Sequence, residues 1–179
     1  MDLELFYLIN GIRNVGLDWL MLLVSYLGEF GVLFIVIGLL SLFLDKKNGK
    51  KLVILFIIGV GLKFFLIDFI MKGVFFRERP FLVLDGVRQM GKVWLNSSFP
   101  SGHSFMAFLG LVIFSEYKKL KVFLIVFAFL TLFSRVYLGM HYPSDVIFGG
   151  LLGYIVGLFV LWLDNRKYIE KYVKVFKLK

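Results

Sequence analysis

The sequence predicts an all-α integral membrane protein, a helical bundle of about six transmembrane helices. Hydrophobic residues make up 60% of the 179 residues, and the mean hydropathy is +0.88, which excludes an ordinary soluble domain. A helix needs about 20 apolar residues to cross a bilayer, and in lipid every backbone N–H and C=O must be satisfied within its own segment. We therefore expect helices throughout, in a single membrane-embedded domain over residues 1–179.

Five apolar segments follow one another along the chain. In order they are Phe30–Leu44, Leu52–Met71, Ser101–Phe114, Val122–Phe133 and Val146–Leu163. The first and third are short for about 30 Å of hydrocarbon at about 1.5 Å per residue, so flanking residues must complete them. The region Leu3–Leu27 carries polar residues between two short apolar stretches, so it could cross once or lie as a bent hairpin at the interface. A crossing is favoured and gives six spans.

Positive charge gathers in three segments. Residues 45–51 hold four Lys, residues 117–121 hold three, and residues 164–179 hold six Lys or Arg, out of 21 in the chain. If the spans alternate, all three face one side, which the positive-inside rule makes cytoplasmic. The loop 73–99 and the turn 139–143 then face the periplasmic or extracellular side. This placement accounts for the net charge of +9 without a nucleic-acid partner, and it predicts that the tail 164–179 is a basic amphipathic helix on anionic headgroups.

A proline and a serine stand immediately before the third apolar segment, in Pro100-Ser101-Gly102-His103. They predict a helix start with Ser101 at or near the N-cap. The first N–H groups of a helix have no partner within it, and Gly102 lets an anion approach them closely. Ordinary capping explains Ser101 equally well. His103 has no evident structural reason to be there, which favours an anion site.

The last apolar segment begins in a similar way, with Pro143-Ser144-Asp145 shortly after His141. Asp145 follows His141 by four residues and is within reach of its Nδ1–H. Such a carboxylate fixes the tautomer that presents a lone pair on Nε2, and it stabilises the cation formed on attack. His103 and His141 are the two histidines of the chain.

Three cations, Lys72, Arg79 and Arg135, stand at the ends of apolar segments on the same side as the histidines. Snorkelling at the interface explains one of them easily, but not three on the side that the positive-inside rule disfavours. Arg and Lys side chains stabilise the charge on the equatorial oxygens of a phosphoryl group in transfer. Other cations of that side are interpreted as loop surface or headgroup contacts: Arg77, Arg88 and Lys92.

Taken together, these stretches resemble the three-part signature of the type 2 phosphatidic acid phosphatase family, whose superfamily includes the vanadium haloperoxidases. The matching motifs are Lys72-x6-Arg79-Pro80, Pro100-Ser101-Gly102-His103 and Ser134-Arg135-x5-His141-x3-Asp145. They cover residues 72–145, the motif-bearing core. The small multi-span chain is similar to the membrane lipid phosphatases of this family.

The resemblance implies a role for each matching residue. His141 would be the nucleophile that forms a phosphohistidine, and Asp145 would orient it. His103 would protonate the leaving oxygen and then activate water. The residues implied to bind phosphoryl oxygens are Lys72, Arg79, Ser101, Gly102 and Arg135. Neither a metal nor another cofactor is implied.

The expected function is hydrolysis of a lipid phosphate or diphosphate at the outer face of the cytoplasmic membrane. Candidate substrates are a polyprenyl diphosphate, phosphatidylglycerophosphate, phosphatidate and a lipid A phosphate. A phosphotransferase could use the same phosphohistidine. A non-enzymatic transporter is the alternative from another class, and it would spread ionisable residues through the middle of the membrane. The expected partners are the lipid substrate and the bilayer, and the chain could be a monomer or a homodimer.

Several residues outside the signature also carry predictions. A ladder of small residues, Gly149, Gly153 and Gly157, predicts close helix packing, with a homodimer seam as the lesser alternative. Asp68 precedes Lys72 by one helical turn and is expected to orient it, and Lys63 is expected to have a buried partner such as Glu29. Aromatic residues of the loop are expected to form an interfacial belt or a lip that admits lipid tails: Phe75, Phe76, Phe81, Trp94 and Phe99.

Overall fold

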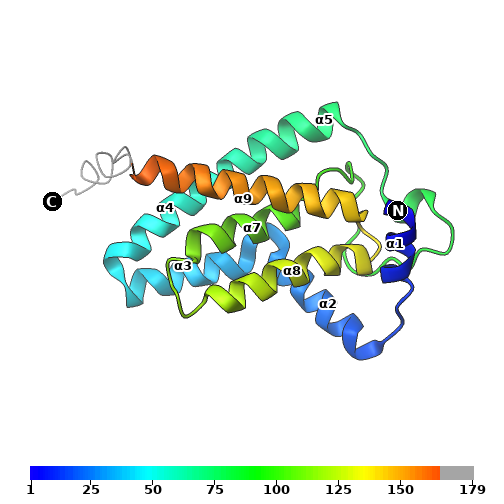
Figure 1. Ribbon diagram of the computed structural model, residues 1–179, viewed down its shortest axis with the longest axis horizontal. Coiled ribbons are helices and arrows are strands. Elements are labelled where there is room, and N and C mark those ends of the chain that lie inside the picture. The colour runs from blue at the N-terminus through cyan, green and yellow to red at the C-terminus, as the bar shows by residue number, and fades with distance from the viewer. Residues whose placement is uncertain (166–179) are drawn as a thin grey trace.

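The protein is described here by a computed structural model over residues 1–165, in which long helices lie side by side along one axis (Figure 1). The helices in chain order are α1 (Asp2–Asn10), α2 (Val15–Gly28), η1 (Glu29–Gly31), α3 (Val32–Leu44), α4 (Lys46–Lys63), η2 (Phe64–Met71), α5 (Lys72–Val74), α6 (Pro80–Val83), α7 (Gly102–Phe114), α8 (Lys121–Tyr137) and α9 (Pro143–Asn165). No strand occurs within residues 1–165, so the predicted all-α class is confirmed.

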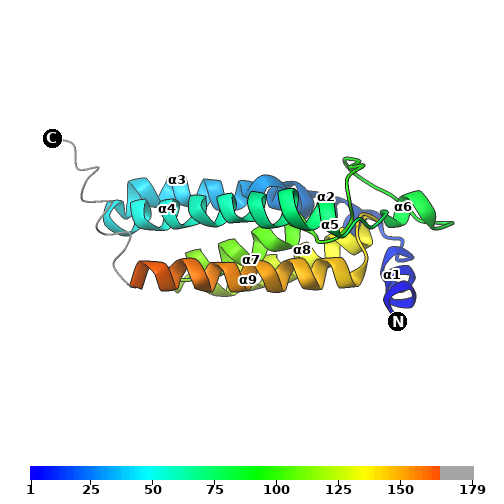
Figure 2. The ribbon, with the colours of Figure 1, turned by 90° about the horizontal axis from the view of Figure 1, so that it is seen from above.

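The long helices form two layers. Seen from above, α3 and α4 lie over α7, α8 and α9, while α1 stands across one end of the bundle (Figure 2). Helix α7 packs against both α8 and α9 and also contacts α4. Among the described residues, three segments are long and apolar enough to cross a membrane, namely Val15–Leu44, Asn48–Val74 and Pro143–Asp164.

Helix α7 is the centre of the bundle. Ten of its 13 residues, from Ser104 onward, are buried, and a helix that is apolar on every face is stable only when other helices surround it. At about 1.5 Å per residue, α7 is too short to cross the hydrocarbon alone. Its first residues, Gly102 and His103, therefore begin inside the bundle rather than at its outer end.

The N-terminal region differs from the sequence prediction. The expected separate crossing within Leu3–Leu27 is not present, because α1 has nine residues and α2 continues into α3 as one bent segment, Val15–Leu44. The bend lies at η1, where Phe30 has φ 51° and Gly31 has φ 73°. Positive φ is uncommon for a residue with a side chain, whereas glycine adopts it readily. The bend places η1 against α7, with Gly31 buried and Phe30 exposed.

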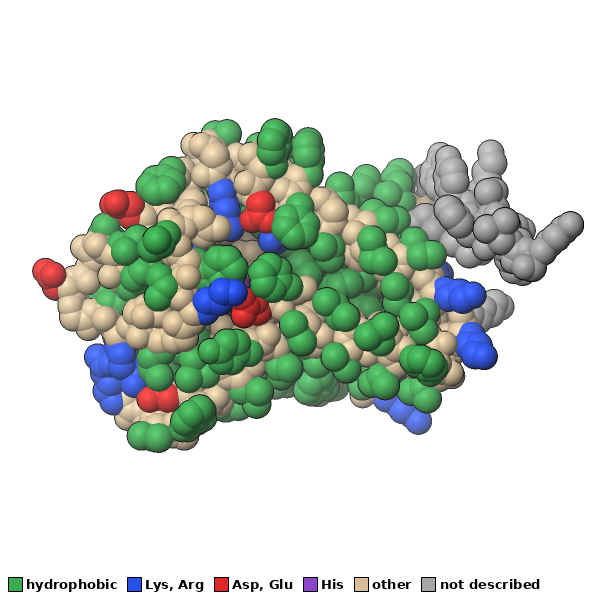
Figure 3. Space-filling model, turned by 180° about the vertical axis from the view of Figure 1, so that it is seen from behind, with side chains coloured by type: hydrophobic (Ala, Val, Ile, Leu, Met, Phe, Trp, Pro, Cys, Tyr) green, Lys and Arg blue, Asp and Glu red, His purple; other side chains and the backbone are tan. Residues whose placement is uncertain are grey.

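Charged residues separate to the two ends of the molecule. The α3–α4 turn, the α7–α8 turn and the C-terminal end of α9 share one end, and α1, α6 and the α8–α9 turn share the other (Figures 1 and 2). Hydrophobic side chains cover the middle (Figure 3). The Lys-rich segments 45–51 and 117–121 thus lie at the same end, as predicted. The predicted amphipathic tail falls almost entirely on residues 166–179, outside the described residues.

The glycine ladder of α9 packs against α7. A Cβ on Gly149 would lie 2.4 Å from the backbone oxygen of Ser101, and one on Gly153 would lie 2.2 Å from that of Phe105. Any side chain at these positions would push α7 away, so the ladder provides the close packing that the sequence predicted. Because α7 already covers this face, the alternative of a homodimer seam along it is wrong.

Candidate active site

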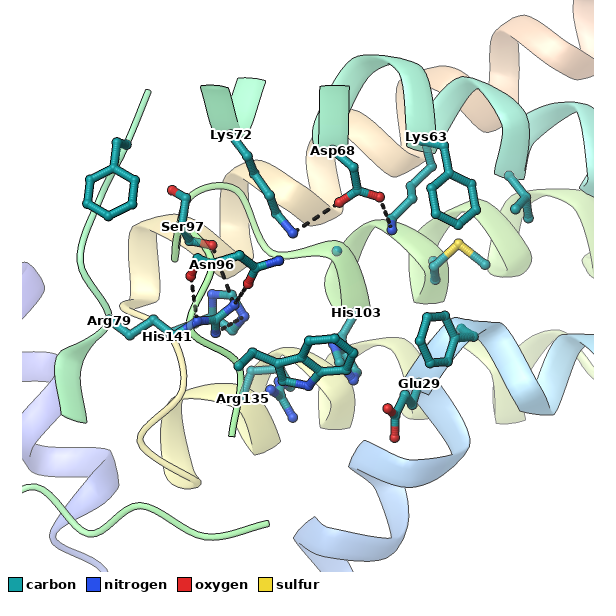
Figure 4. A pocket seen from close by; sticks show the side chains of 17 residues that line it. Glu29, Lys63, Asp68, Lys72, Arg79, Asn96, Ser97, His103, Arg135 and His141 are labelled. Carbon is teal, nitrogen blue, oxygen red and sulfur yellow. Dashed lines mark hydrogen bonds and ion pairs between the residues drawn. The ribbon is translucent and has the colours of Figure 1, made fainter. Parts of the chain in front are cut away.

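A cavity of about 780 Å³ lies between the two layers, toward the end of the bundle that holds α1 and α6. Figure 3 shows the surface hollowed there, with Lys or Arg and Asp or Glu side chains around the hollow. Its polar and charged lining, drawn in Figure 4, consists of Glu29, Lys63, Asp68, Lys72, Arg79, Asn96, Ser97, His103, Arg135 and His141. Both histidines of the chain, 38 positions apart, thus face one space.

His141 is held in the turn between α8 and α9. Its backbone N–H donates to the carbonyl oxygen of Arg135 at 3.2 Å, and its side chain is 3% exposed. The Nε2 atom lies 3.2 Å from Nη1 of Arg79. An arginine N–H can only donate, so Nε2 is the nitrogen with the lone pair and Nδ1 carries the ring proton. The neutral ring therefore has its unprotonated nitrogen beside a cation of the cavity.

The pKa of His141 agrees with a neutral ring. Burial, assisted by the charges of Arg79 and Arg135 and opposed by Asp145, lowers this pKa from 6.5 to about 3. Burial also lowers the pKa of Arg79, from 12.5 to about 10. At neutral pH the site thus combines an unprotonated imidazole with a charged guanidinium.

Asp145 lies behind His141 and reaches it through a third side chain. The Nδ1 atom of His141 is 3.7 Å from Oδ2 of Asp145, too far for a direct hydrogen bond. Ser98 Oγ lies 3.4 Å from the same nitrogen and donates a short hydrogen bond to Oδ2 of Asp145. Because Nδ1 carries the proton, Ser98 can accept from the ring while it donates to the carboxylate. The predicted His–Asp pair is therefore bridged by Ser98.

Two further groups hold the carboxylate of Asp145, whose side chain is completely buried. The backbone N–H of Tyr142 donates to Oδ2 at 2.9 Å, and Arg77 Nη1 donates to Oδ1 at 2.6 Å. Arg77 also donates to Asp2 at 2.8 Å, which ties α1 to the site. The interpretation of Arg77 as loop surface or a headgroup contact is therefore wrong. Arg77 thus links the carboxylate of Asp145, in the first turn of α9, to that of Asp2 in α1.

The two cavity arginines are used differently. Arg79 donates to Asn96 Oδ1 at 2.7 Å and to the carbonyl oxygens of Asn96 and Met140 at 2.9 and 3.0 Å. Arg135 is 3% exposed, and its Nη1 donates to Ser25. Its Nε and Nη2 have no partner among residues 1–165. Buried donors are normally satisfied, so these two unpartnered donors of a cavity-lining side chain distinguish Arg135 from Arg79.

Lys72 is paired as the sequence predicted. Its Nζ lies 3.0 Å from Oδ1 of Asp68, and Asp68 Oδ2 accepts from Lys63 at 2.6 Å. The expected partner of Lys63, Glu29, was wrong: Glu29 pairs with Lys92 at 2.9 Å. The acid that satisfies Lys63 lies five residues ahead on its own helix, whereas Lys92 comes from the loop that covers η1.

The start of α7 contributes residues in two ways. Gly102 and His103 line the cavity. Ser101 is fully buried and caps the helix, since its Oγ accepts from the backbone N–H of Ser104 at 3.4 Å. Its own N–H donates to the carbonyl oxygen of Asp145 at 3.1 Å, which joins the starts of α7 and α9. Ser101 thus lies behind the cavity wall and does not line the cavity.

The other loop residues with sequence predictions differ in where the structure places them. Phe76 and Trp94 line the cavity beside Phe30, as expected of a lip, whereas Phe99 packs on Phe148 with ring centroids 4.9 Å apart. Arg88, which was interpreted as surface, forms an ion pair with Asp18. Sequence reasoning missed Asn96 and Ser98. A polar run before Phe99-Pro100 was the available signal, but it has no periodicity that indicates which side chains point inward.

Within residues 1–165, no three His, Asp or Glu side chains are grouped in a way that could hold a metal ion.

The sequence matches the PAP2 superfamily over residues 51–169. It is 32% identical over 179 residues to an undecaprenyl-diphosphatase of Sulfolobus acidocaldarius, covering 98% of this chain and 84% of the relative. It is 30% identical over 165 residues to the bacitracin transport permease protein BcrC of Bacillus licheniformis, covering 90% and 80%. The crystal structure of Aquifex aeolicus LpxE superposes with a TM-score of 0.75 at 33% identity, covering 89% of this chain and 94% of that one.

Proposed function

Because the chain belongs to the PAP2 superfamily, we propose that its cavity hydrolyses a lipid phosphate or diphosphate through a phosphohistidine on His141, without a metal ion. That the chain is a membrane-embedded lipid phosphatase follows from its relatives and its apolar spans. The observation that carries the mechanism is the shared cavity. It brings the two histidines together with Lys72, Arg79 and Arg135, and it leaves two donors of Arg135 free.

In the first step, the terminal phosphate binds with its non-bridging oxygens toward Lys72, Arg79 and Arg135. The lone pair of His141 Nε2 attacks phosphorus, so an N–P bond forms while the P–O bond to the lipid breaks. His103 gives its proton to the leaving oxygen. As the ring of His141 becomes cationic, its Nδ1–H is stabilised through Ser98 by the carboxylate of Asp145.

In the second step, His103 takes a proton from water, and the water oxygen attacks phosphorus. The N–P bond breaks, inorganic phosphate leaves, and His141 returns to its neutral state. The first N–H groups of α7, at Gly102, would assist by donating to phosphoryl oxygens. Ser101, which caps the helix behind them, would hold these groups in place. The fixed cations supply the electrostatic stabilisation that a metal gives in other phosphoryl-transfer sites.

A polyprenyl diphosphate is the first substrate to test. The Sulfolobus relative is named for a substrate of that kind, and exposed aromatic rings at the cavity, Phe30, Phe64 and Phe76, offer an apolar path for a long tail. The Lys-rich turns at the opposite end would face the cytoplasm. The cavity would then face the outer side of the cytoplasmic membrane.

The test is phosphate release from undecaprenyl diphosphate by purified protein in detergent with EDTA, together with acid-labile ³²P labelling of the protein. We expect metal-free release that vanadate inhibits. His141→Ala should abolish both release and labelling. Activity that persists in His141→Ala, or that requires a divalent metal, would contradict the mechanism.

His103→Ala tests the proposed acid. The loss should be larger for an alkyl phosphate, whose leaving oxygen needs a proton, than for an activated aryl phosphate. Equal losses on both substrates would contradict the assignment.

A transporter is the second candidate, because the Bacillus licheniformis relative is named a transport permease. In the described part of the chain, however, the cavity and both histidines lie toward one end of the bundle. A wild-type protein that binds a lipid diphosphate but releases no phosphate from any lipid phosphate would favour transport.

A further inference from the structure

Lys63 is a cavity residue that the proposed mechanism does not use. Its side chain is 12% exposed and lies within the span Asn48–Val74, where an ionisable group is costly unless it is paired or functional. It stands on the cavity wall with Lys72, and Asp68 lies between the two ammonium groups (Figure 4).

The helix is distorted in a way that turns Lys63 toward the cavity. In a regular α-helix, Lys63 and Asp68 would lie roughly 140° apart around the axis, because each residue turns the chain by about 100°. Residues Phe64–Met71 instead form the π-helix η2, whose ladder joins residues five apart. Lys63 and Asp68 are five apart and meet at 2.6 Å. The π-helix therefore places Lys63, Asp68 and Lys72 on one face.

The position of Lys63 relative to the nucleophile is the second observation. A Cβ on Gly102 would lie 3.6 Å from Lys63 Nζ, so this ammonium group is beside the residue that precedes His103. In Figure 4, Lys63 lies beyond Lys72 and Asp68 on the side away from His141. An in-line displacement puts the leaving group opposite the nucleophile. Lys63 thus stands on the leaving-group side.

We propose that Lys63 binds the second phosphate of a lipid diphosphate, the one that leaves attached to the tail, and that it makes diphosphates preferred over monophosphates. This rests on the proposed function. Attack by His141 on the terminal phosphorus breaks its bond to the bridging oxygen, and the electron pair of that bond goes to the departing lipid monophosphate. Lys63 would balance the charge that develops there, while His103 protonates the departing oxygen.

Charge in the cavity is consistent with this assignment. The signature cations Lys72, Arg79 and Arg135 contribute three positive charges, Asp68 removes one, and Lys63 restores it. The second carboxylate of the lining, Glu29, is balanced by Lys92 from the loop. A phosphate monoester carries about −1.5 to −2 at neutral pH, and a diphosphate ester carries about one charge more. The competing explanation is that Lys63 only neutralises Asp68, in which case it would not distinguish the two substrate classes.

The experiment compares farnesyl diphosphate with farnesyl monophosphate, two substrates with the same tail, using purified wild type and variants in detergent. Wild type should prefer the diphosphate in kcat/KM. Lys63→Met should lower kcat/KM for the diphosphate at least tenfold more than for the monophosphate, and Lys63→Arg should restore most of the preference. Equal losses on both substrates, or no loss, would overturn the proposal.

Two further variants separate charge balance from recognition. Lys51→Met is the matched control, because Lys51 is a partly buried, ion-paired lysine of the same helix, bound to Glu116 and Asp164. It should keep the wild-type ratio of kcat/KM between the two farnesyl substrates.

The double variant Lys63→Met/Asp68→Asn removes one positive and one negative charge, so the net charge of the cavity returns to the wild-type value. Recovery of the wild-type ratio in this variant would show that Lys63 is only a counter-charge, and the proposal expects no recovery.

A measurement on wild type alone keeps the proposal testable if Lys63→Met does not fold. Methylenediphosphonate should inhibit farnesyl monophosphate hydrolysis at least tenfold more strongly than methylphosphonate, and equal inhibition would overturn the assignment. Failure of the proposed function would look different, since wild type would then release phosphate from neither farnesyl substrate.

Discussion

Replacing Ser98 by alanine removes the hydroxyl that joins His141 to Asp145. The gap between Nδ1 and Oδ2 would remain 3.7 Å, and neither the backbone N–H of Tyr142 nor Arg77 reaches the ring. Asp145 would keep both of these partners, so its charge would stay compensated and the fold should persist. The variant therefore isolates the link between the carboxylate and the imidazole.

The size of the effect follows from the kind of bond that is lost. A hydrogen bond to a charged group contributes about 1.5–3 kcal/mol. The link matters most when the ring of His141 becomes cationic, so most of this energy should appear in the transition state. We expect kcat to fall roughly 10- to 150-fold in Ser98→Ala. The KM should change little, because Ser98 does not line the cavity.

The assay is steady-state phosphate release from a polyprenyl diphosphate in detergent, with kcat and KM determined separately. Ser41→Ala is the matched control. Ser41 is also buried and donates to a carbonyl oxygen, that of Gly38, at 2.6 Å, but it lies at the opposite end of the bundle. A kcat for Ser98→Ala within twofold of that of Ser41→Ala would refute the bridge, and so would an effect confined to KM.

Three other predictions concern different parts of the molecule. Asp68→Ala removes the carboxylate that holds Lys72, so kcat/KM should fall about tenfold, or about 1.4 kcal/mol, and full wild-type turnover would rule out an orienting role. Gly153→Ala places a Cβ 2.2 Å from a backbone oxygen of α7, so the free energy of unfolding should fall by about 1–3 kcal/mol and the unfolding temperature should fall with it. Gly61→Ala is the control, because a Cβ there would have no atom within 4 Å, and its unfolding temperature should not change. The His141 ring signal in an NMR titration should not move between about pH 8 and pH 5, since burial lowers its pKa to about 3, and a midpoint near 6.5 would contradict this. Because the unfolded chain takes up that proton below about pH 6.5 and the folded chain does not, stability should fall as the pH falls from 6.5 toward 3.

Pattern and composition predicted the helical membrane class, the shared end of the Lys-rich turns and the close packing of α9. Each of these depends on local chemistry. A long apolar run must become a helix in lipid, and a run of small residues leaves room for a neighbouring helix. The pairing of Asp68 with Lys72 was also predicted from spacing along one helix, and the two groups lie 3.0 Å apart.

Other features depended on contacts between distant segments, and the sequence failed there. Arg77 looked like a loop cation until Asp2 and Asp145, 75 and 68 residues away, were seen to bind it. Lys63 failed for a local reason: the expected partner was Glu29, whereas the π-helix η2 brings Asp68, five residues ahead, within 2.6 Å of its ammonium group.

The sequence by itself determined which chemical groups this protein possesses: two imidazoles, their cations and one acid in a recognisable order, on segments that must be helical in lipid. Only the tertiary structure decided how those groups are joined, with Ser98 between His141 and Asp145 and Lys63 on the cavity wall. The reason is that spacing along a helix fixes the direction of a side chain, whereas the path of a loop and the pitch of a distorted helix depend on what they pack against.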